Sequence, residues 1–175
     1  MHKTLTMMVA LILLVATPLP AQEFGVKPGP EHAFLKEAEG VWDATAKSMG
    51  NESKGELHCK MALNGLWLLE HYKGATAGKA FEGRGATSYD PAKKKFVNVW
   101  IDSMVPSPMI SEGTYDKEKK TMTLLGDMPM PDGKSMKSSI TIAYKDANTK
   151  VLSLKGNKGG KEFEMVEITY RRRAK

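Results

Sequence analysis

The stretch GKAFEGRGATSYDPAKKKFVNVWIDSM, residues 78–104, decides the fold of this chain. Its centre, Tyr89-Asp90-Pro91, has the chemistry of a turn, because an aspartate carboxylate accepts hydrogen bonds from the backbone that follows and proline presets φ. On both sides of this centre the side chains alternate with a period of two, which is typical of strands. The stretch therefore predicts an antiparallel β-hairpin with arms at 80–89 and 95–103.

The second arm of this hairpin is apolar on both faces. Val97, Val99 and Ile101 lie on one face and alternate with the face that carries Trp100 and Asp102. A strand of this kind is covered on both sides or faces a cavity, so the hairpin belongs in the wall of a larger closed sheet. The sequence leaves two registers open, since either of the two faces can point inward.

The rest of the chain repeats the strand pattern every 10 to 16 residues, with Gly, Pro, Asn or Asp between the strands. Residues 31–38 have helical periodicity instead and predict a short capping helix. Short connections favour antiparallel neighbours, and closing the sheet removes its two exposed edges. We therefore predict an all-β fold, an antiparallel up-and-down barrel of ten strands. The expected strands are 41–48, 55–63, 66–74, 80–89, 95–103, 109–115, 121–127, 135–144, 150–156 and 161–172.

Alternation within the strands also predicts which side chains point into the barrel. In strand 55–63 the apolar set is Leu57, Cys59, Met61 and Leu63. Cys59 is the only cysteine, so the sequence excludes an intramolecular disulfide, and a buried, inert thiol is favoured over a nucleophile. Arg172 shares the inward face of the last strand and therefore needs a partner at the end of the barrel.

Residues 1–21 have the pattern of a secretory signal peptide. Their apolar core, Met7 to Thr17, has 11 residues, shorter than the roughly 20 needed to cross a bilayer. We expect cleavage after Ala21 and a protein that is secreted or periplasmic. A Pro/Gly linker over 22–30 then leads to one domain over 31–175, and we expect no membrane span.

Composition and motifs exclude several classes of function. The net charge of +6 comes from lysines spread over turns rather than from a basic stripe with aromatics, so we expect no nucleic-acid partner. The sequence has no Gly-x-Ser-x-Gly elbow, phosphate loop or His-Glu-x-x-His motif. His32, His58 and His71 are too dispersed in the predicted barrel to form a metal site, and we expect no cofactor.

Several short motifs, in order, resemble a known family. They are Gly40-x-Trp42, Phe81-Glu82-Gly83-x-Gly85, Trp100-Ile101-Asp102-Ser103-Met104, Glu112-Gly113-Thr114 and Ile168-Thr169-Tyr170-x-Arg172. They resemble the bacterial domain-of-unknown-function family 1579 from about His32 to Arg172. This resemblance implies a calycin-like barrel, of the lipocalin or fatty-acid-binding-protein kind, in which Arg172 packs across Trp42. It implies no activity and no catalytic residues.

The leading functional hypothesis is a barrel that binds a small, largely apolar ligand. The candidate residues inside the barrel are Trp67, His71, Trp100, Asp102 and Glu112. Related calycin-like barrels bind haem, and His71 has the chemistry of an axial ligand, but a hydrogen-bonded wall histidine is favoured. One alternative is an enzyme that uses Asp102 and Glu112 as a carboxylate pair, and another is a filled barrel that acts as an interaction module. An enzyme is the less favoured interpretation.

Overall fold

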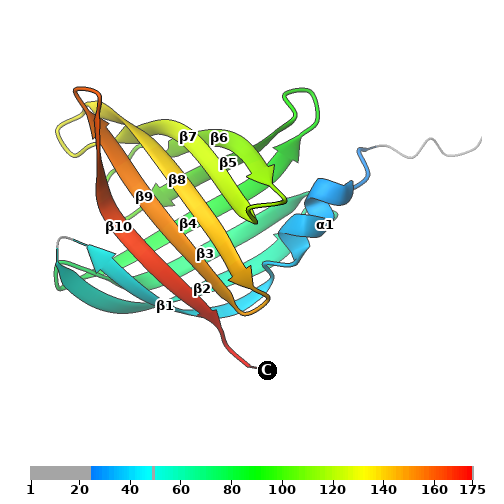
Figure 1. Cartoon of the computed structure of the whole chain (residues 1–175), viewed down its shortest axis with the longest axis horizontal. Helices are drawn as coiled ribbons and strands as arrows, with labels where there is room; N and C mark the ends of the chain where they lie inside the picture. The colour runs from blue at the N-terminus through cyan, green and yellow to red at the C-terminus, as the bar shows by residue number, and fades with distance from the viewer. Residues whose placement is uncertain (1–24, 49, 175) are drawn as a thin grey trace, which may run out of the picture.

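The computed structural model of the protein describes residues 25–48 and 50–174, and it shows a closed barrel of antiparallel strands (Figure 1). Each strand pairs with its neighbours in sequence, and β1 pairs with β10 to close the sheet. The predicted ten-stranded up-and-down barrel is confirmed. The signal peptide expected over 1–21 lies outside the described residues. The strands are β1 (Gly40–Ser48), β2 (Asn51–Ala62), β3 (Trp67–Thr76), β4 (Lys79–Asp90), β5 (Lys95–Asp102), β6 (Met109–Asp116), β7 (Thr121–Pro129), β8 (Ser135–Asp146), β9 (Thr149–Lys158) and β10 (Lys161–Arg172).

The hairpin that decides the fold consists of β4 and β5, in a register that runs from Asp90 opposite Lys95 to Gly83 opposite Asp102. The Asp90 carboxylate accepts hydrogen bonds from the backbone N–H groups of Ala92 and Lys93, at 2.9 and 3.1 Å. This is the turn that the Tyr89-Asp90-Pro91 sequence predicts.

The inward residues of β2 follow the predicted alternation up to the end of the strand. Leu57 and Cys59 of β2 are buried, as expected. Leu63 instead lies in the β2–β3 turn, where it has a φ of +50° and is 66% exposed. The expectation that Leu63 points inward is wrong, because Asn64 and Gly65 continue the left-handed backbone and end the strand at Ala62.

One end of the barrel is closed by the short helix α1 (Pro30–Lys36), which Figure 1 shows beside the strand ends. Phe34 of α1 stacks on Tyr115 with the ring centroids 4.0 Å apart and contacts Phe96 and Tyr144 edge-on. These rings come from β6, β5 and β8, so one helical side chain joins three strands. In the described part of the chain, no helix has the length and apolar character to cross a bilayer.

At the same end, Trp42 joins the first strand to the last. The Arg172 guanidinium lies 4.0 Å from the centroid of the indole ring, and the Lys150 ammonium lies 4.7 Å from it. Gly40 makes room for this contact, because it has a φ of +128° and a Cβ there would come within 2.9 Å of Arg172 Nη1. The Gly-x-Trp motif is therefore a steric requirement of the closure.

Arg172 also satisfies backbone groups that the strands leave free. Its guanidinium donates to the carbonyl oxygens of Glu37 (2.7 Å), Ala147 (3.0 Å) and Glu39. These residues lie after α1 and in the β8–β9 turn, so one side chain ties the cap and a turn to the end of β10.

Replacing Arg172 by alanine should destabilise the protein by about 2 kcal/mol, because stacking is lost and carbonyl groups lose their donors. The measurement is the free energy of unfolding from urea denaturation. Arg171→Ala is the matched control, since Arg171 is exposed on the other face of the same strand. Equal effects of the two substitutions would contradict this role of Arg172.

Candidate functional site

The structure selects one of the two registers that the sequence left open for β5. Trp100 and Asp102 point into the barrel, whereas Ile101 is exposed on the outside. The indole lies against Gly83, where a Cβ would come within 2.1 Å of its ring. The Trp100 indole N–H donates to Asp102 Oδ2 at 3.1 Å, and Asp102 Oδ1 accepts from the backbone N–H of Met104 at 2.8 Å. Asp102 therefore holds both the indole and the start of the β5–β6 loop.

The predicted carboxylate pair is wrong, because Glu112 lies on the outside of the barrel. Met109 and Ser111 are the buried residues of β6 and point inward. Glu112 follows Ser111 in the strand, so its side chain points outward. There, Glu112 forms ion pairs with Lys93 (2.5 Å) and Lys95 (3.9 Å). Asp102 and Glu112 are on opposite faces of the sheet and cannot share a proton.

Trp67 and His71 are also on the outer face, contrary to expectation. Leu68, which alternates with them, is buried inside β3. His71 Nε2 lies 2.7 Å from a carboxylate oxygen of Glu82 on the neighbouring strand. The interpretation of His71 as a hydrogen-bonded wall histidine agrees with this contact.

A hydrogen-bonded polar group that the sequence analysis did not select lies inside the barrel. Thr87 donates its hydroxyl proton to Glu70 Oε2 at 3.3 Å, and the Asn98 amide donates to Thr87 Oγ1 at 2.9 Å. Burial raises the pKa of the Glu70 carboxyl, and the Lys150 charge and the Thr87 hydrogen bond oppose that rise. The next inward residue in this row, Ser111, has a fully enclosed hydroxyl with no hydrogen-bond partner among the described residues.

Lys150 is another charged side chain of the interior. Its place directly after the β8–β9 turn suggests an exposed turn lysine, yet it is only 4% exposed and lies over the Trp42 and Tyr170 rings. Across the sheet it pairs with Tyr144 on one side and Tyr170 on the other. Strand parity was the one sequence signal for it, because Lys150 alternates in phase with Leu152 and Leu154.

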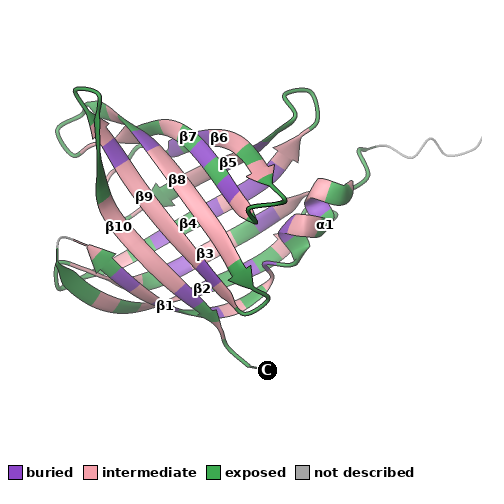
Figure 2. Cartoon of the chain, viewed as in Figure 1, coloured by how far each residue is buried: buried purple, intermediate pink, exposed green. Residues whose placement is uncertain are grey.

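The inner faces of β8–β10 are aliphatic beyond this row. Two further rows across these strands contain Ile142, Leu152 and Ile168, and then Ile140, Leu154 and Val166. All six keep intermediate exposure, as Figure 2 shows for these strands. Leu124 of β7 has the same orientation in the same single-layer wall and is only 2% exposed. The partial exposure of the six residues therefore indicates that other side chains cover them incompletely from inside.

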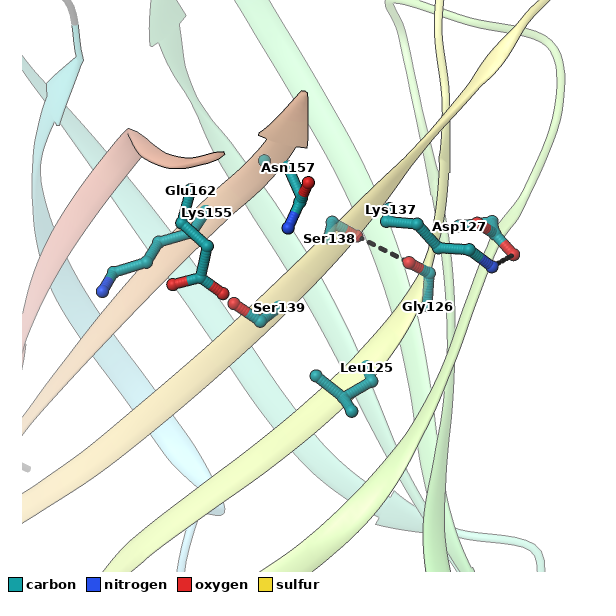
Figure 3. A pocket seen from close by; sticks show the side chains of 10 residues that line it. Leu125, Gly126, Asp127, Lys137, Ser138, Ser139, Lys155, Asn157 and Glu162 are labelled. Atoms are coloured by element: carbon teal, nitrogen blue, oxygen red, sulfur yellow. Dashed lines mark hydrogen bonds and ion pairs between the residues drawn. The ribbon is translucent and has the colours of Figure 1, made fainter. Parts of the chain in front are cut away.

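Two hollows lie on the outer wall of the barrel. Figure 3 shows one of about 440 Å³ over β7–β10, beside Leu125, Ser139, Lys155 and Glu162. A second, of about 470 Å³, adjoins it over β5–β7 beside Ile110 and Leu125. The polar groups of the first are partly paired with one another, since Lys137 and Asp127 form an ion pair at 2.9 Å.

The described residues contain neither a side-chain cluster that could hold a metal ion nor an exposed thiol. Residues 25–48 and 50–174 contain no cluster of three or more His, Cys, Asp or Glu side chains that could hold a metal ion. Cys59 is buried, and burial raises the pKa of its thiol to about 12. The thiol therefore stays protonated at neutral pH, which is the inert state that the sequence analysis favoured.

Comparison with known proteins gives the family and the fold. A family model described as "Protein of unknown function (DUF1579)" matches residues 27–172. The crystal structure of Rv2717c from M. tuberculosis is similar, with a TM-score of 0.58 and 16% identity over 83% of this chain and 99% of that one. The structure of the S-type phycobiliprotein lyase CPES from Guillardia theta has a TM-score of 0.56 and 10% identity, over 83% and 93%. At these identities the likeness concerns the fold alone, and no curated protein matches the chain.

Replacing Glu70 by glutamine should raise the urea midpoint at pH 8 and leave it unchanged at pH 4. An acid whose pKa is raised by folding contributes stability below its unfolded pKa and loses that contribution as the pH rises through its folded pKa. The wild type therefore bears the cost of a buried carboxylate at pH 8, and the variant does not. A urea midpoint of Glu70→Gln below that of the wild type at pH 8 would show instead that the Glu70 charge stabilises the fold.

The Cys59 thiol should resist alkylation in the native protein. Iodoacetamide at pH 8 should label it at least 100-fold more slowly than in urea, because the thiolate is the reactive form and burial suppresses it. Mass spectrometry of the alkylated protein measures both rates. Equal rates in buffer and in urea would rule out a protected thiol.

Proposed function

The chain belongs to the DUF1579 family, and from its own inner wall we propose that it binds a small, largely apolar molecule inside the barrel. The observation that carries this proposal is the partial exposure of the six aliphatic residues on β8–β10. Apolar side chains that a core does not cover completely gain free energy when an apolar ligand covers them, about 25 cal/mol for each Å² removed from water. The opposite wall needs no such partner, since Leu57 and Leu68 are already buried.

The entrance for this ligand lies at the end away from α1. There the β5–β6 and β7–β8 loops connect the strands. Asp102 lies at the rim, where β5 ends, and Trp100 lies two residues further inside. The other end is filled by Phe34 and its aromatic partners. A ligand that enters past Trp100 reaches the aliphatic rows without displacing the cap.

The enzyme alternative loses the carboxylate pair on which it depended, because Glu112 is outside. We further propose that the protein binds its ligand outside the cytoplasm. The signal-peptide pattern of residues 1–21 supports this second proposal.

Filling the interior should weaken the binding of an apolar dye. We expect Nile red to bind the wild type with enhanced fluorescence and to bind Ile140→Trp at least tenfold more weakly, because the larger side chain occupies the space beside the aliphatic rows. Fluorescence titration gives the two dissociation constants, and urea denaturation shows that both proteins are folded.

Ser139→Trp is the matched control, since Ser139 is the adjacent residue of β8 and borders the outer hollow. It should leave the affinity for Nile red unchanged. If Ser139→Trp weakens binding and Ile140→Trp does not, the dye binds on the outer wall and the proposal is wrong. A wild type that does not bind the dye would contradict it too.

A further inference from the structure

Three hydrogen-bond donors lie side by side on the inner wall, at the deep end of the aliphatic rows. Tyr144, Lys150 and Tyr170 are direct neighbours across β8, β9 and β10. An ammonium group has three N–H donors and no acceptor, and a phenol hydroxyl is a donor at neutral pH. We name this set the donor row.

The donor row has no acceptor of its own in the described part of the chain. Lys150 contacts the Trp42 and Tyr170 rings but forms no ion pair or hydrogen bond there, and the hydroxyls of Tyr144 and Tyr170 form no hydrogen bond either. All three side chains point inward, and Lys150 and Tyr170 are almost fully buried. Among the described residues, Ser111 Oγ is the one fully enclosed side-chain polar atom without a partner, so the donor atoms of the row are not enclosed and can donate to an acceptor from outside the chain.

The acidic side chains near the donor row form no ion pair with Lys150 among the residues described. Glu70 interacts with Lys150 through its charge, but its Oε2 accepts a hydrogen bond from Thr87. Glu37 is the other acidic side chain whose charge acts on Tyr144. Arg172, which also lies over the Trp42 ring, directs its own donors to backbone carbonyls. The positive charge of Lys150 therefore has no carboxylate within ion-pair distance.

The aliphatic rows begin directly beside the donor row and run toward the open end. From Lys150, β9 passes through Leu152 to Leu154, a distance of about 13 Å at the usual rise of a strand. The neighbouring positions on β8 and β10 are aliphatic as well. The inner wall thus offers donors at its deep end and a continuous apolar surface beyond them.

We propose that the ligand is an anionic amphiphile of the alkyl carboxylate class, with its carboxylate on the donor row and its chain along the aliphatic rows. This inference rests on the proposed function and specifies the ligand class of the same site. Lys150 supplies the charge, and the hydroxyls of Tyr144 and Tyr170 donate to the two carboxylate oxygens.

The test compares dodecanoate with dodecanol, which have the same chain and differ in the head group. In competition with Nile red, dodecanoate should displace the dye from the wild type at a concentration at least tenfold lower than dodecanol. Lys150→Met should raise the dodecanoate concentration that displaces the dye at least tenfold. The dodecanol concentration that displaces the dye should stay unchanged. Lys145→Met is the matched control, since Lys145 is exposed at the same end, and it should change neither.

Two further variants keep the test decisive if Lys150→Met does not fold. Tyr144→Phe and Tyr170→Phe remove only a hydroxyl. Each should weaken the binding of dodecanoate at least threefold and leave the binding of dodecanol unchanged. Dodecanoate that binds no better than dodecanol, or that is insensitive to all three substitutions, would overturn this inference while dye binding still supports the proposed function. Failure of the wild type to bind Nile red would instead contradict the proposed function itself.

Discussion

The structure depends on the contact between the first and last strands, where two cations lie over one indole ring. Trp42 of β1 carries Arg172 of β10 and Lys150 of β9 on its ring, so closure of the barrel and burial of an interior lysine are one interaction. Arginine on an indole is a favourable contact, and here it also supplies donors to carbonyl groups near α1. This stack adds to the backbone pairing of β1 with β10, which leaves neither strand as a free sheet edge.

This closure leaves the inner wall with two unlike halves. On the side of β2 and β3, residues such as Leu57 and Leu68 complete a conventional core. On the side of β8–β10 the aliphatic residues are covered only in part, and the donor row lies below them. The helix seals one end, so a molecule that uses the uncovered half must enter between the loops of the other end.

The fold could be predicted from the sequence because its signals are local. Turn residues such as Asp90-Pro91, alternation within single strands and short connections together require a closed antiparallel sheet. The site could not be predicted to the same degree, because β5 is apolar on both faces and alternation alone cannot orient it. For the same reason, Glu112, His71 and Trp67 were predicted to point inward, whereas they point outward. Glu70 and Lys150 were not predicted inside the barrel for another reason, because charged residues are rarely buried and their residue type favours the surface.

The most direct test of ligand binding inside the barrel is methyl NMR of the protein with and without Nile red. The interior site predicts chemical-shift changes at the methyl groups of Ile140, Leu152 and Leu154, on the inner faces of β8 and β9. The methyl groups of Ile110 and Leu125, which are exposed on the outer wall, should stay unchanged. Shifts confined to Ile110 and Leu125 would place the ligand on the outside and contradict binding within the barrel.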